Sequence, residues 1–366
     1  MEEIDLVIIG GGVIGLACAC ETARPGRTVC LLERHPRLGS ETSTHNSGVI
    51  HSGIYYPTGS LKARLCLEGR ETLYAFCAHH QVACRRSGKL ILAEAGGSDA
   101  GLAHLLDRGL ANGVDDLEII AADVVRKLEP NVAARVALWS PSTGIVDAEA
   151  LVRALQHEAD KHNTIVLPAM PLVAGEIYPD RVEVRTPAEM IRARAVVNAA
   201  GLEADQVSAM LGGKEFRIYP CRGEYAELLG KSRDLVSRPV YPMPASTGEH
   251  LGVHLTPTTW GTVTVGPTAH YQEAKDDHES QRLPVEAFLE PTRSLLPSVQ
   301  PTDLRLGGTG IRAKLSSDSA AFSDFLIERD PEQPLLIHAA GIDSPGLTAC
   351  LSIARLVASL VDEVLN

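Results

Sequence analysis

Residues 4–15, IDLVIIGGGVIG, decide the fold of the N-terminal part of this chain. The apolar run Ile4–Ile9 is typical of a buried parallel strand. Gly10, Gly12 and Gly15 follow it at the spacing GxGxxG, which forms a tight turn, lets backbone approach a pyrophosphate and lets the next helix pack closely on the strand. The phosphates would lie at the start of that helix, where free N–H groups and the helix dipole favour an anion.

A second apolar run, Thr28–Leu32, predicts the next strand, and Glu33 ends it. An acidic side chain at this point can accept hydrogen bonds from the ribose hydroxyls of an adenosine, whereas a ribose 2′-phosphate would require a basic one. The order of strand, glycine turn, helix, strand and acid therefore predicts a dinucleotide-binding unit. These residues alone leave FAD and NAD open as its ligand.

The composition limits what the whole chain can be. Its 366 residues exceed the usual size of a single hydrophobic core, so we expect two lobes. The 34 basic and 46 acidic residues give a net charge of −12, which argues against nucleic acid as a partner. An anionic substrate must therefore be held by local arginine, lysine or histidine side chains.

The N-terminus carries Glu2, Glu3 and Asp5 and lacks the basic region of a secretory signal. No stretch reaches the roughly 18 apolar residues that a membrane-spanning helix needs. We therefore expect a cytoplasmic protein without an integral membrane segment, for which peripheral membrane contact stays open. The eight cysteines include no CxxC pair, which predicts buried reduced thiols and no metal site.

Apolar periodicity and turn residues predict the other elements. The polar segment 35–60 is too long for a simple turn, so we expect it to be functional. Short alternating runs between residues 215 and 267 predict an antiparallel sheet that covers a pocket. The remaining predicted helices are 61–79, 102–112, 148–162 with Asp147 as N-cap, and 347–365, and the remaining predicted strands are 89–94, 164–167, 171–177, 181–186, 193–201 and 335–341.

Three motifs in this order resemble those of the FAD-dependent oxidoreductases of the D-amino-acid oxidase and glycine oxidase superfamily. They are GGGVIG with Glu33, VVNAAG at 196–201 and HAAGIDSPGLT at 338–348. Within the superfamily, the stretches HNSGVIHSGIYYPTGSLKARLCLEG, CRGEYAEL, LGVHLTP and GIDSPGLTACLSIA are similar to the branch of L-2-hydroxyglutarate dehydrogenases and oxidases. The resemblance covers essentially the whole chain.

The resemblance implies an α/β fold with a discontinuous Rossmann-like FAD-binding lobe and an α+β substrate lobe that has a mainly antiparallel sheet. We assign residues 1–80, 140–212 and 306–366 to the FAD-binding domain, and residues 81–139 and 213–305 to the substrate-binding domain. It also implies the residues that contact FAD: Gly10, Gly12, Val13, Ile14, Gly15, Glu33, Arg34, Thr42, Ser43, His45, Asn46, Ser47, Val173, Ala200, Gly201, Gly310, Arg312, Gly341, Ile342, Asp343, Ser344, Pro345, Gly346, Leu347 and Thr348. We expect the FAD to be noncovalent, although His45 occupies a position at which a histidine bonds to the flavin in some related amine dehydrogenases.

Oxidation of a 2-hydroxy acid requires a cation for the carboxylate, a base for the hydroxyl proton and a hydride acceptor. Arg312 in GGTGIRAKL is the candidate for the carboxylate, because a guanidinium binds it bidentately. The base is His51 or His254, since histidine titrates near neutral pH. Tyr56, Tyr225, Tyr241 and Lys314 are candidates for further substrate contacts.

The leading hypothesis is a flavoenzyme that oxidises an L-2-hydroxy acid, such as L-2-hydroxyglutarate, to the 2-oxo acid by hydride transfer to the flavin. A second hypothesis keeps the fold and FAD but takes an amino acid or amine, as glycine and sarcosine oxidases do. A third is a non-catalytic FAD-binding protein. The residues leave the electron acceptor open between oxygen, a quinone and a carrier protein.

Overall fold

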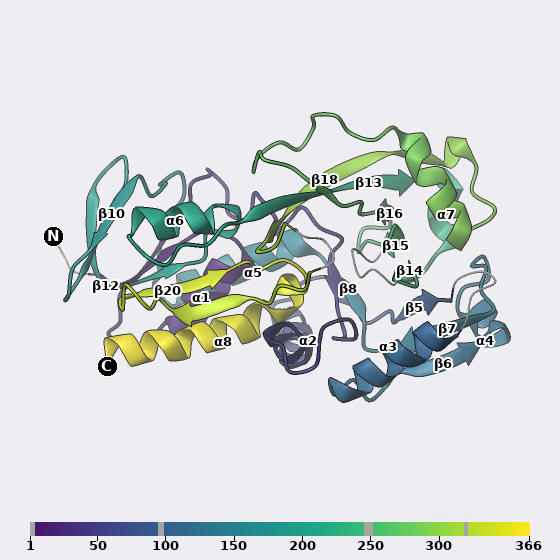
Figure 1. Cartoon of the computed structure of the whole chain (residues 1–366), viewed down its shortest axis with the longest axis horizontal. Helices are drawn as coiled ribbons and strands as arrows, with labels where there is room; N and C mark the ends of the chain where they lie inside the picture. The colour runs from purple at the N-terminus through teal and green to yellow at the C-terminus, as the bar shows by residue number, and fades with distance from the viewer. Residues whose placement is uncertain (1–3, 94–98, 245–251, 318–320) are drawn as a thin grey trace.

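A computed structural model describes residues 4–93, 99–244, 252–317 and 321–366. These residues form two lobes, each built on a large β-sheet (Figure 1). The long antiparallel pair β13 (Tyr219–Leu228) and β18 (Leu304–Lys314) extends from beside the first lobe into the second. The first lobe contains both the first and the last strand of the chain, so it is discontinuous in sequence, as predicted.

The first sheet has a parallel centre in the order β20, β12, β1, β2, β9. β2, β20 and the second half of β1 are fully buried, which explains their mainly apolar sequences, whereas β9 at the end of this set is partly exposed. A hairpin at one end of the sheet and one further strand pair antiparallel with this centre. The strands are β1 (Ile4–Ile9), β2 (Val29–Leu32), β9 (Ile165–Leu167), β10 (Ala174–Ile177), β11 (Val182–Arg185), β12 (Met190–Asn198), β19 (Leu326–Arg329) and β20 (Leu336–Ala340).

Helices cover both faces of this sheet. Four helices pack on one face: α1 (Val13–Thr22), α2 (Leu61–His79), α5 (Ala148–Lys161) and α8 (Gly346–Leu365), and they share one core with Leu6, Ile8 and Leu31. The opposite face packs against the short α6 (Ala204–Met210) and the β10–β11 hairpin. The sequence predicted α2 at its observed bounds and placed the ends of α5 and α8 within one residue.

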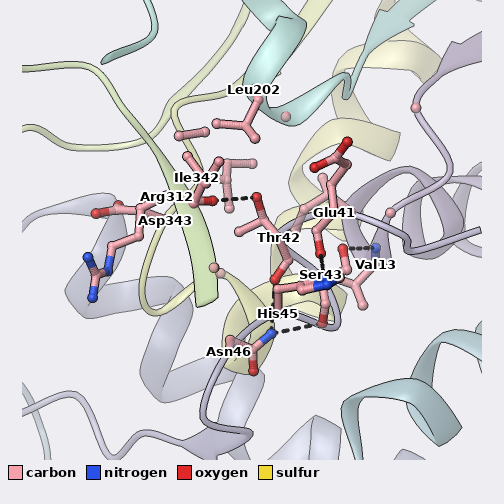
Figure 2. A pocket seen from close by; sticks show the side chains of 18 of the residues that line it. Val13, Glu41, Thr42, Ser43, His45, Asn46, Leu202, Arg312, Ile342 and Asp343 are labelled. Carbon is pink, nitrogen blue, oxygen red and sulfur yellow. Dashed lines mark hydrogen bonds between the residues drawn. The ribbon is translucent and has the colours of Figure 1, made fainter. Parts of the chain in front are cut away.

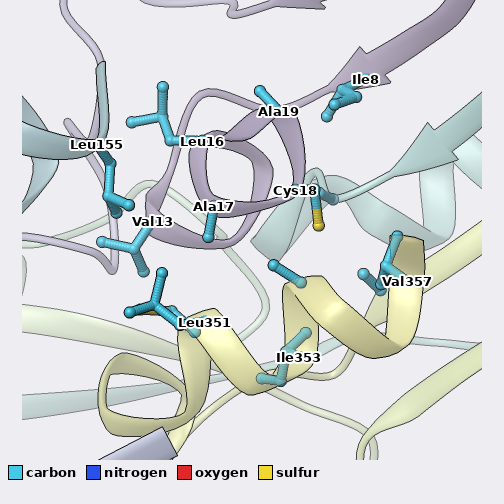
Figure 3. Close-up of a cluster of buried hydrophobic side chains, with 14 of the residues drawn as sticks. Ile8, Val13, Leu16, Ala17, Cys18, Ala19, Leu155, Leu351, Ile353 and Val357 are labelled. Carbon is cyan, nitrogen blue, oxygen red and sulfur yellow. The ribbon is translucent and has the colours of Figure 1, made fainter. Parts of the chain in front are cut away.

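The centre of the first lobe is the contact between α1 and α8 (Figure 3). Val13, Ala17 and Cys18 of α1 are buried there and face Leu351 and Val357 of α8. Small residues on α1 let the two helices approach closely, and each fully buried leucine contributes about 1.5–3 kcal/mol to folding. This packing fixes the start of α8 close to the start of α1.

The second sheet is mainly antiparallel, as predicted, but β5 and β14 pair in parallel. Its strands run in the order β17, β13, β16, β15, β14, β5, β7, β6, and β18 lies along the other edge of β13. The members besides β13 and β18 are β5 (Lys89–Leu92), β6 (Glu118–Ala121), β7 (Val136–Ser140), β14 (Val240–Pro242), β15 (His254–Pro257), β16 (Val263–Gly266) and β17 (His270–Tyr271). The predicted domain boundary at residue 306 falls inside β18, which extends along both lobes with β13, and the division of the chain into domains stays a prediction.

A separate three-stranded sheet has the order β3 (Val49–Ile50), β8 (Gly144–Val146), β4 (Cys84–Arg85). The other helices are α3 (Ala100–Ala111), α4 (Ala122–Leu128) and α7 (Leu289–Leu295), with single 3₁₀ turns at Gly201–Glu203, Gly230–Leu235, Val285–Phe288 and Pro301–Asp303. The eight cysteines are all unpaired. Within the described ranges, no helix is long and apolar enough to cross a bilayer, and no cluster of three or more His, Cys, Asp or Glu side chains is arranged to hold a metal ion.

Candidate active site

One cavity of about 600 Å³ runs from the carboxyl ends of β1 and β2 to the underside of the second sheet. Ligands of parallel α/β sheets bind at this edge, because the loops and the helix N-termini point there. Residues from both lobes line the cavity, among them Gly12, Glu33, Ser47, Tyr241 and Arg312. Segments that lie far apart in the sequence therefore meet at a single site.

The glycine turn after β1 forms one wall of the cavity. Gly10 has φ +114°, which only glycine adopts readily, and a side chain on it would collide with the carbonyl of Ala199. Gly15 lies under the turn, where a side chain would collide with the carbonyl of Gly10. Gly12 faces the cavity, and the only atom within 3 Å of a Cβ placed there is Oγ of Ser43. Neighbouring backbone atoms therefore require glycine at positions 10 and 15, whereas glycine at position 12 leaves space for a ligand.

Glu33 and Arg34 lie at the end of the cavity next to β2. The Glu33 carboxylate is buried and accepts hydrogen bonds from the backbone N–H groups of Gly11 and His35, both at 2.7 Å. Arg34 forms ion pairs with Glu41 at 2.8 Å and Glu203 at 2.9 Å. Glu33 therefore faces the expected ribose position as an oriented acceptor, while Arg34 closes this end as part of an ion-pair network.

The loop 42–47 lies between the start of α1 and the strand that carries Arg312 (Figure 2). Oγ of Ser43 accepts a hydrogen bond from Val13 N at 3.0 Å, and the Thr42 hydroxyl donates to the carbonyl of Ile311 at 2.7 Å. The amide of Asn46 donates back to the carbonyls of Thr42 and Ser43. His45 lies against Gly310 of β18. A side chain at position 310 would collide with the backbone carbonyl of His45. The loop is held in one conformation by both lobes.

Residues 342–347 form the opposite wall and include the first turn of α8. This helix has no side-chain cap, and the N–H of Gly346 donates to the carbonyl of Asp343 at 2.6 Å. The next N–H groups of the first turn are left for a carbonyl or an anion, and the helix dipole adds a positive potential. The carboxylate of Asp343 is fixed by a buried ion pair with Lys62 at 2.6 Å. The Ser344 hydroxyl lies 3.2 Å from both the Tyr56 hydroxyl and Nε2 of His51.

Arg312 lies on β18 opposite Cys221 of β13, and its guanidinium points away from the loop 42–47 (Figure 2). Its Nη1 donates to Sγ of Cys221 at 3.7 Å and its Nη2 donates to the carbonyl of Thr268 at 3.1 Å. A Cβ on Gly223 would lie 2.8 Å from the guanidinium, so only glycine leaves room for this rotamer. Among the described residues no carboxylate lies within ion-pair distance of Arg312. The cavity therefore contains a guanidinium that lacks an anionic partner.

The two candidate bases also line the cavity. The Nδ1–H of His254 donates to the carbonyl of Gly252 at 2.9 Å, so its Nε2 carries the lone pair when the ring is neutral. Burial lowers the pKa of His254 to about 3, and burial likewise holds the pKa of His51 well below its usual value. The ring of His254 stacks on Tyr241 at 3.7 Å. Both histidines are neutral at physiological pH and able to accept a proton.

Several predicted contact residues do not line the cavity. The N–H of Val173 is used by the carbonyl of Arg185 and its side chain is half exposed, whereas the preceding residues 170–172 reach the cavity. Thr348 is buried and holds the N–H of His51 through its hydroxyl. Tyr56 acts only through Ser344, and Gly15 and Gly341 shape turns behind the wall. The other predicted site residues line the cavity, including Lys314, Ala200 and Gly201.

Within CRGEYAEL the sequence predicted Tyr225 as a candidate substrate contact but not the roles of Cys221 and Gly223. Cys221, Gly223 and Tyr225 alternate with Arg222 and Glu224, which form a buried ion pair at 3.1 Å. Cys221 and Tyr225 line the cavity, and Gly223 makes room for Arg312. Period-2 alternation in the sequence is the signal that could have found this face. Gln206, Pro267 and Tyr271 also line the cavity and carried no such signal.

Comparisons with known proteins define the class. The chain matches the model of the family described as FAD dependent oxidoreductase over residues 5–360, and it belongs to this family. It is 33% identical to the mitochondrial L-2-hydroxyglutarate dehydrogenase of Arabidopsis thaliana, over 98% of this chain and 83% of that protein. It is 29% identical to the L-2-hydroxyglutarate dehydrogenase of Indibacter alkaliphilus, over 97% and 98%.

Solved structures agree on the fold. The L-alpha-glycerophosphate oxidase of Mycoplasma pneumoniae, a structure with FAD bound, matches with a TM-score of 0.90 and 25% identity over 99% of this chain and 95% of that chain. The glycine oxidase of Geobacillus kaustophilus matches with a TM-score of 0.84 at 21% identity, over 99% and 95%. The discontinuous FAD-binding lobe and the second lobe predicted from the sequence are confirmed. The family match identifies the dinucleotide as FAD and not NAD.

The residues present fit FAD. The cavity is continuous from the adenosine end at Glu33, past the bare backbone at Gly12, to the first turn of α8. The uncapped N–H groups of α8 suit a flavin carbonyl, where negative charge gathers on reduction. The protein is therefore an FAD-dependent oxidoreductase, and the flavin end of the cavity is where its substrate must enter.

Proposed function

We propose that the protein oxidises L-2-hydroxyglutarate to the 2-oxo acid. The observation that carries this proposal is the guanidinium of Arg312, which faces the cavity and has no anionic partner among the described residues, while two neutral histidines line the same space. A guanidinium is matched in shape and charge to a carboxylate. The relatives that are 29–33% identical over nearly the whole chain are named for this substrate, which supports the choice.

Each residue then has a defined part in the reaction. Arg312 binds the C1 carboxylate and orients the carbinol carbon. The unprotonated nitrogen of His51 or His254 accepts the hydroxyl proton while the C–H bond breaks with its electron pair and the carbonyl forms. When bound, FAD supplies the hydride acceptor. Burial of the cavity excludes water from the reacting atoms and strengthens the interaction of Arg312 with the carboxylate.

The test is an anaerobic screen of the purified holoenzyme in which bleaching of the flavin is recorded. L-2-hydroxyglutarate should bleach it, whereas the D enantiomer, glycine, sarcosine and proline should not. Bleaching by an amino acid with release of ammonia would instead show an amine oxidase, and no bleaching by any compound would indicate an FAD-binding protein without this chemistry.

Arg312→Lys should raise the KM for the hydroxy acid strongly and leave FAD bound. Lysine keeps the charge but loses the two parallel N–H donors, and a charge-assisted hydrogen bond is worth roughly 1.5–3 kcal/mol, or about 10- to 100-fold in KM. Steady-state kinetics with Arg305→Lys as the control would check it, since Arg305 is an exposed residue of the same strand that pairs with Glu227. An unchanged KM in Arg312→Lys would remove Arg312 from the carboxylate site.

A further inference from the structure

Lys89 is a buried cation that takes no part in the reaction steps proposed above. It begins β5, and the residue is 1% exposed. Its Nζ lies 4.4 Å from the ring centre of Tyr55 and 4.7 Å from that of Tyr241. In the part of the chain that the structure describes, no carboxylate or hydrogen-bond acceptor pairs with it. Tyr241 stacks in turn on His254, so Lys89 lies one ring behind a candidate base.

A buried ammonium group without a counter-ion destabilises a folded protein. Contacts with aromatic faces return only about 0.5–2 kcal/mol, less than the desolvation penalty of several kcal/mol. Burial accordingly lowers the pKa of Lys89 to about 7, which places its titration in the physiological range. A perturbed titratable group beside a cavity is a candidate for function, because stability alone would favour an apolar residue of similar size.

The groups around Lys89 come from five segments. Tyr55 precedes α2, Cys66 lies on α2, Tyr241 lies on β14, His254 begins β15 and His51 follows β3. None of them is a carboxylate. None of these groups neutralises the positive charge of Lys89, which adds to burial in lowering the pKa of both His51 and His254. Arg312 also lowers the pKa of His254, and His254 lowers that of His51. Nδ1 of His51 is also buried and has no hydrogen-bond partner among the described residues, so a second N–H on this ring would have no acceptor.

We propose that Lys89 is a positioning residue whose buried ammonium keeps His51 and His254 in their neutral, proton-accepting form when an anionic substrate enters the cavity. The proposal rests on the proposed function, in which one of these histidines is the base. A substrate with two carboxylates brings negative charge next to the histidines and favours their protonation. A protonated histidine cannot accept the hydroxyl proton. Lys89 opposes this effect from behind the rings without contacting the substrate.

The first experiment is the pH profile of flavin reduction, measured by rapid mixing under anaerobic conditions. In Lys89→Met we expect the acid limb of the profile to move upward by about one pH unit, with the rate on the alkaline plateau retained. Lys89→Arg, which keeps a charge, should follow the wild-type acid limb. Lys127→Met is the control, because Lys127 is exposed on α4 of the same lobe. An acid limb that stays in place in Lys89→Met, or a rate that falls equally at every pH, would overturn the proposal.

The second experiment uses unfolding of the apoprotein and does not depend on activity. The pKa of Lys89 in the folded protein, about 7, lies below its usual value of 10.5, so the unfolded chain binds a proton between these values that the folded chain does not. The stability of the wild type relative to Lys89→Met should therefore be lowest at pH 7 and below and should rise as the pH approaches 10. Lys89→Gln provides a second neutral variant. A Lys89→Met protein that is less stable than the wild type at pH 6–7 would show that the ammonium has a stabilising partner and would refute the proposal.

The two hypotheses fail in different ways. If His51→Ala and His254→Ala both reduce the flavin at the wild-type rate, the base assignment fails. If one histidine variant is slow and the acid limb of Lys89→Met stays at the wild-type position, the role of Lys89 fails and the base assignment holds.

Discussion

Gly12→Val is expected to abolish FAD binding while the fold survives. Gly12 has φ −79°, which valine adopts without strain, and the protein atom nearest to an added Cβ is the rotatable Oγ of Ser43 at 2.8 Å. The side chain would instead occupy the space at which the pyrophosphate meets the backbone. We expect at least about a 100-fold loss in FAD affinity, equivalent to roughly 2.8 kcal/mol. Visible flavin absorbance of the purified protein and titration of the apoprotein with FAD would measure it.

Gly308→Val is the matched control for this variant. Gly308 lies on β18, an added Cβ there meets no atom within 4 Å, and the residue does not line the cavity. Its flavin content should equal that of the wild type. Circular dichroism of the two apoproteins would separate a lost ligand from a lost fold. Full flavin content in Gly12→Val would mean that the phosphates lie elsewhere than at this turn.

The second large effect concerns the base. His51→Ala or His254→Ala, and not both, should slow flavin reduction by roughly 10²–10⁴-fold while FAD stays bound. We favour His51, because its loop directly follows the segment 42–47 and its Nε2 lies 3.2 Å from the Ser344 hydroxyl in the opposite wall of the cavity. His254 is stacked on Tyr241, so we expect its removal to weaken substrate binding more than it slows flavin reduction.

Rapid mixing of each variant with saturating L-2-hydroxyglutarate would decide between the two histidines. His338→Ala is unsuitable as a control, since His338 is fully buried and hydrogen-bonded to Asp330. His104→Ala on α3 is a better one, because His104 is exposed, does not line the cavity and forms a hydrogen bond with Arg108. Wild-type reduction rates in both His51→Ala and His254→Ala would exclude base catalysis by this pair.

The N-terminal unit was readable from the sequence because its signals are local. The apolar run Ile4–Ile9, the glycine spacing and Glu33 lie within thirty residues of one another, and turn and helix chemistry over that distance leaves few alternatives. The same holds for α2 and α8, whose apolar periodicity set their bounds to within one residue. The pairing of β18 with β13 joins segments some ninety residues apart and had no local signal.

The sequence by itself determined the FAD-binding class, the order of the elements and most of the residues near the cavity. Only the tertiary structure decided how these residues act, because their partners come from distant segments. In the folded protein Arg34 pairs with two acidic side chains, and Val173 does not line the cavity. Gly223 leaves space for the guanidinium of Arg312, which has no carboxylate partner among the described residues. It also buried Lys89 behind Tyr241, since the charge state of a side chain depends on what packs around it and not on its neighbours in the chain.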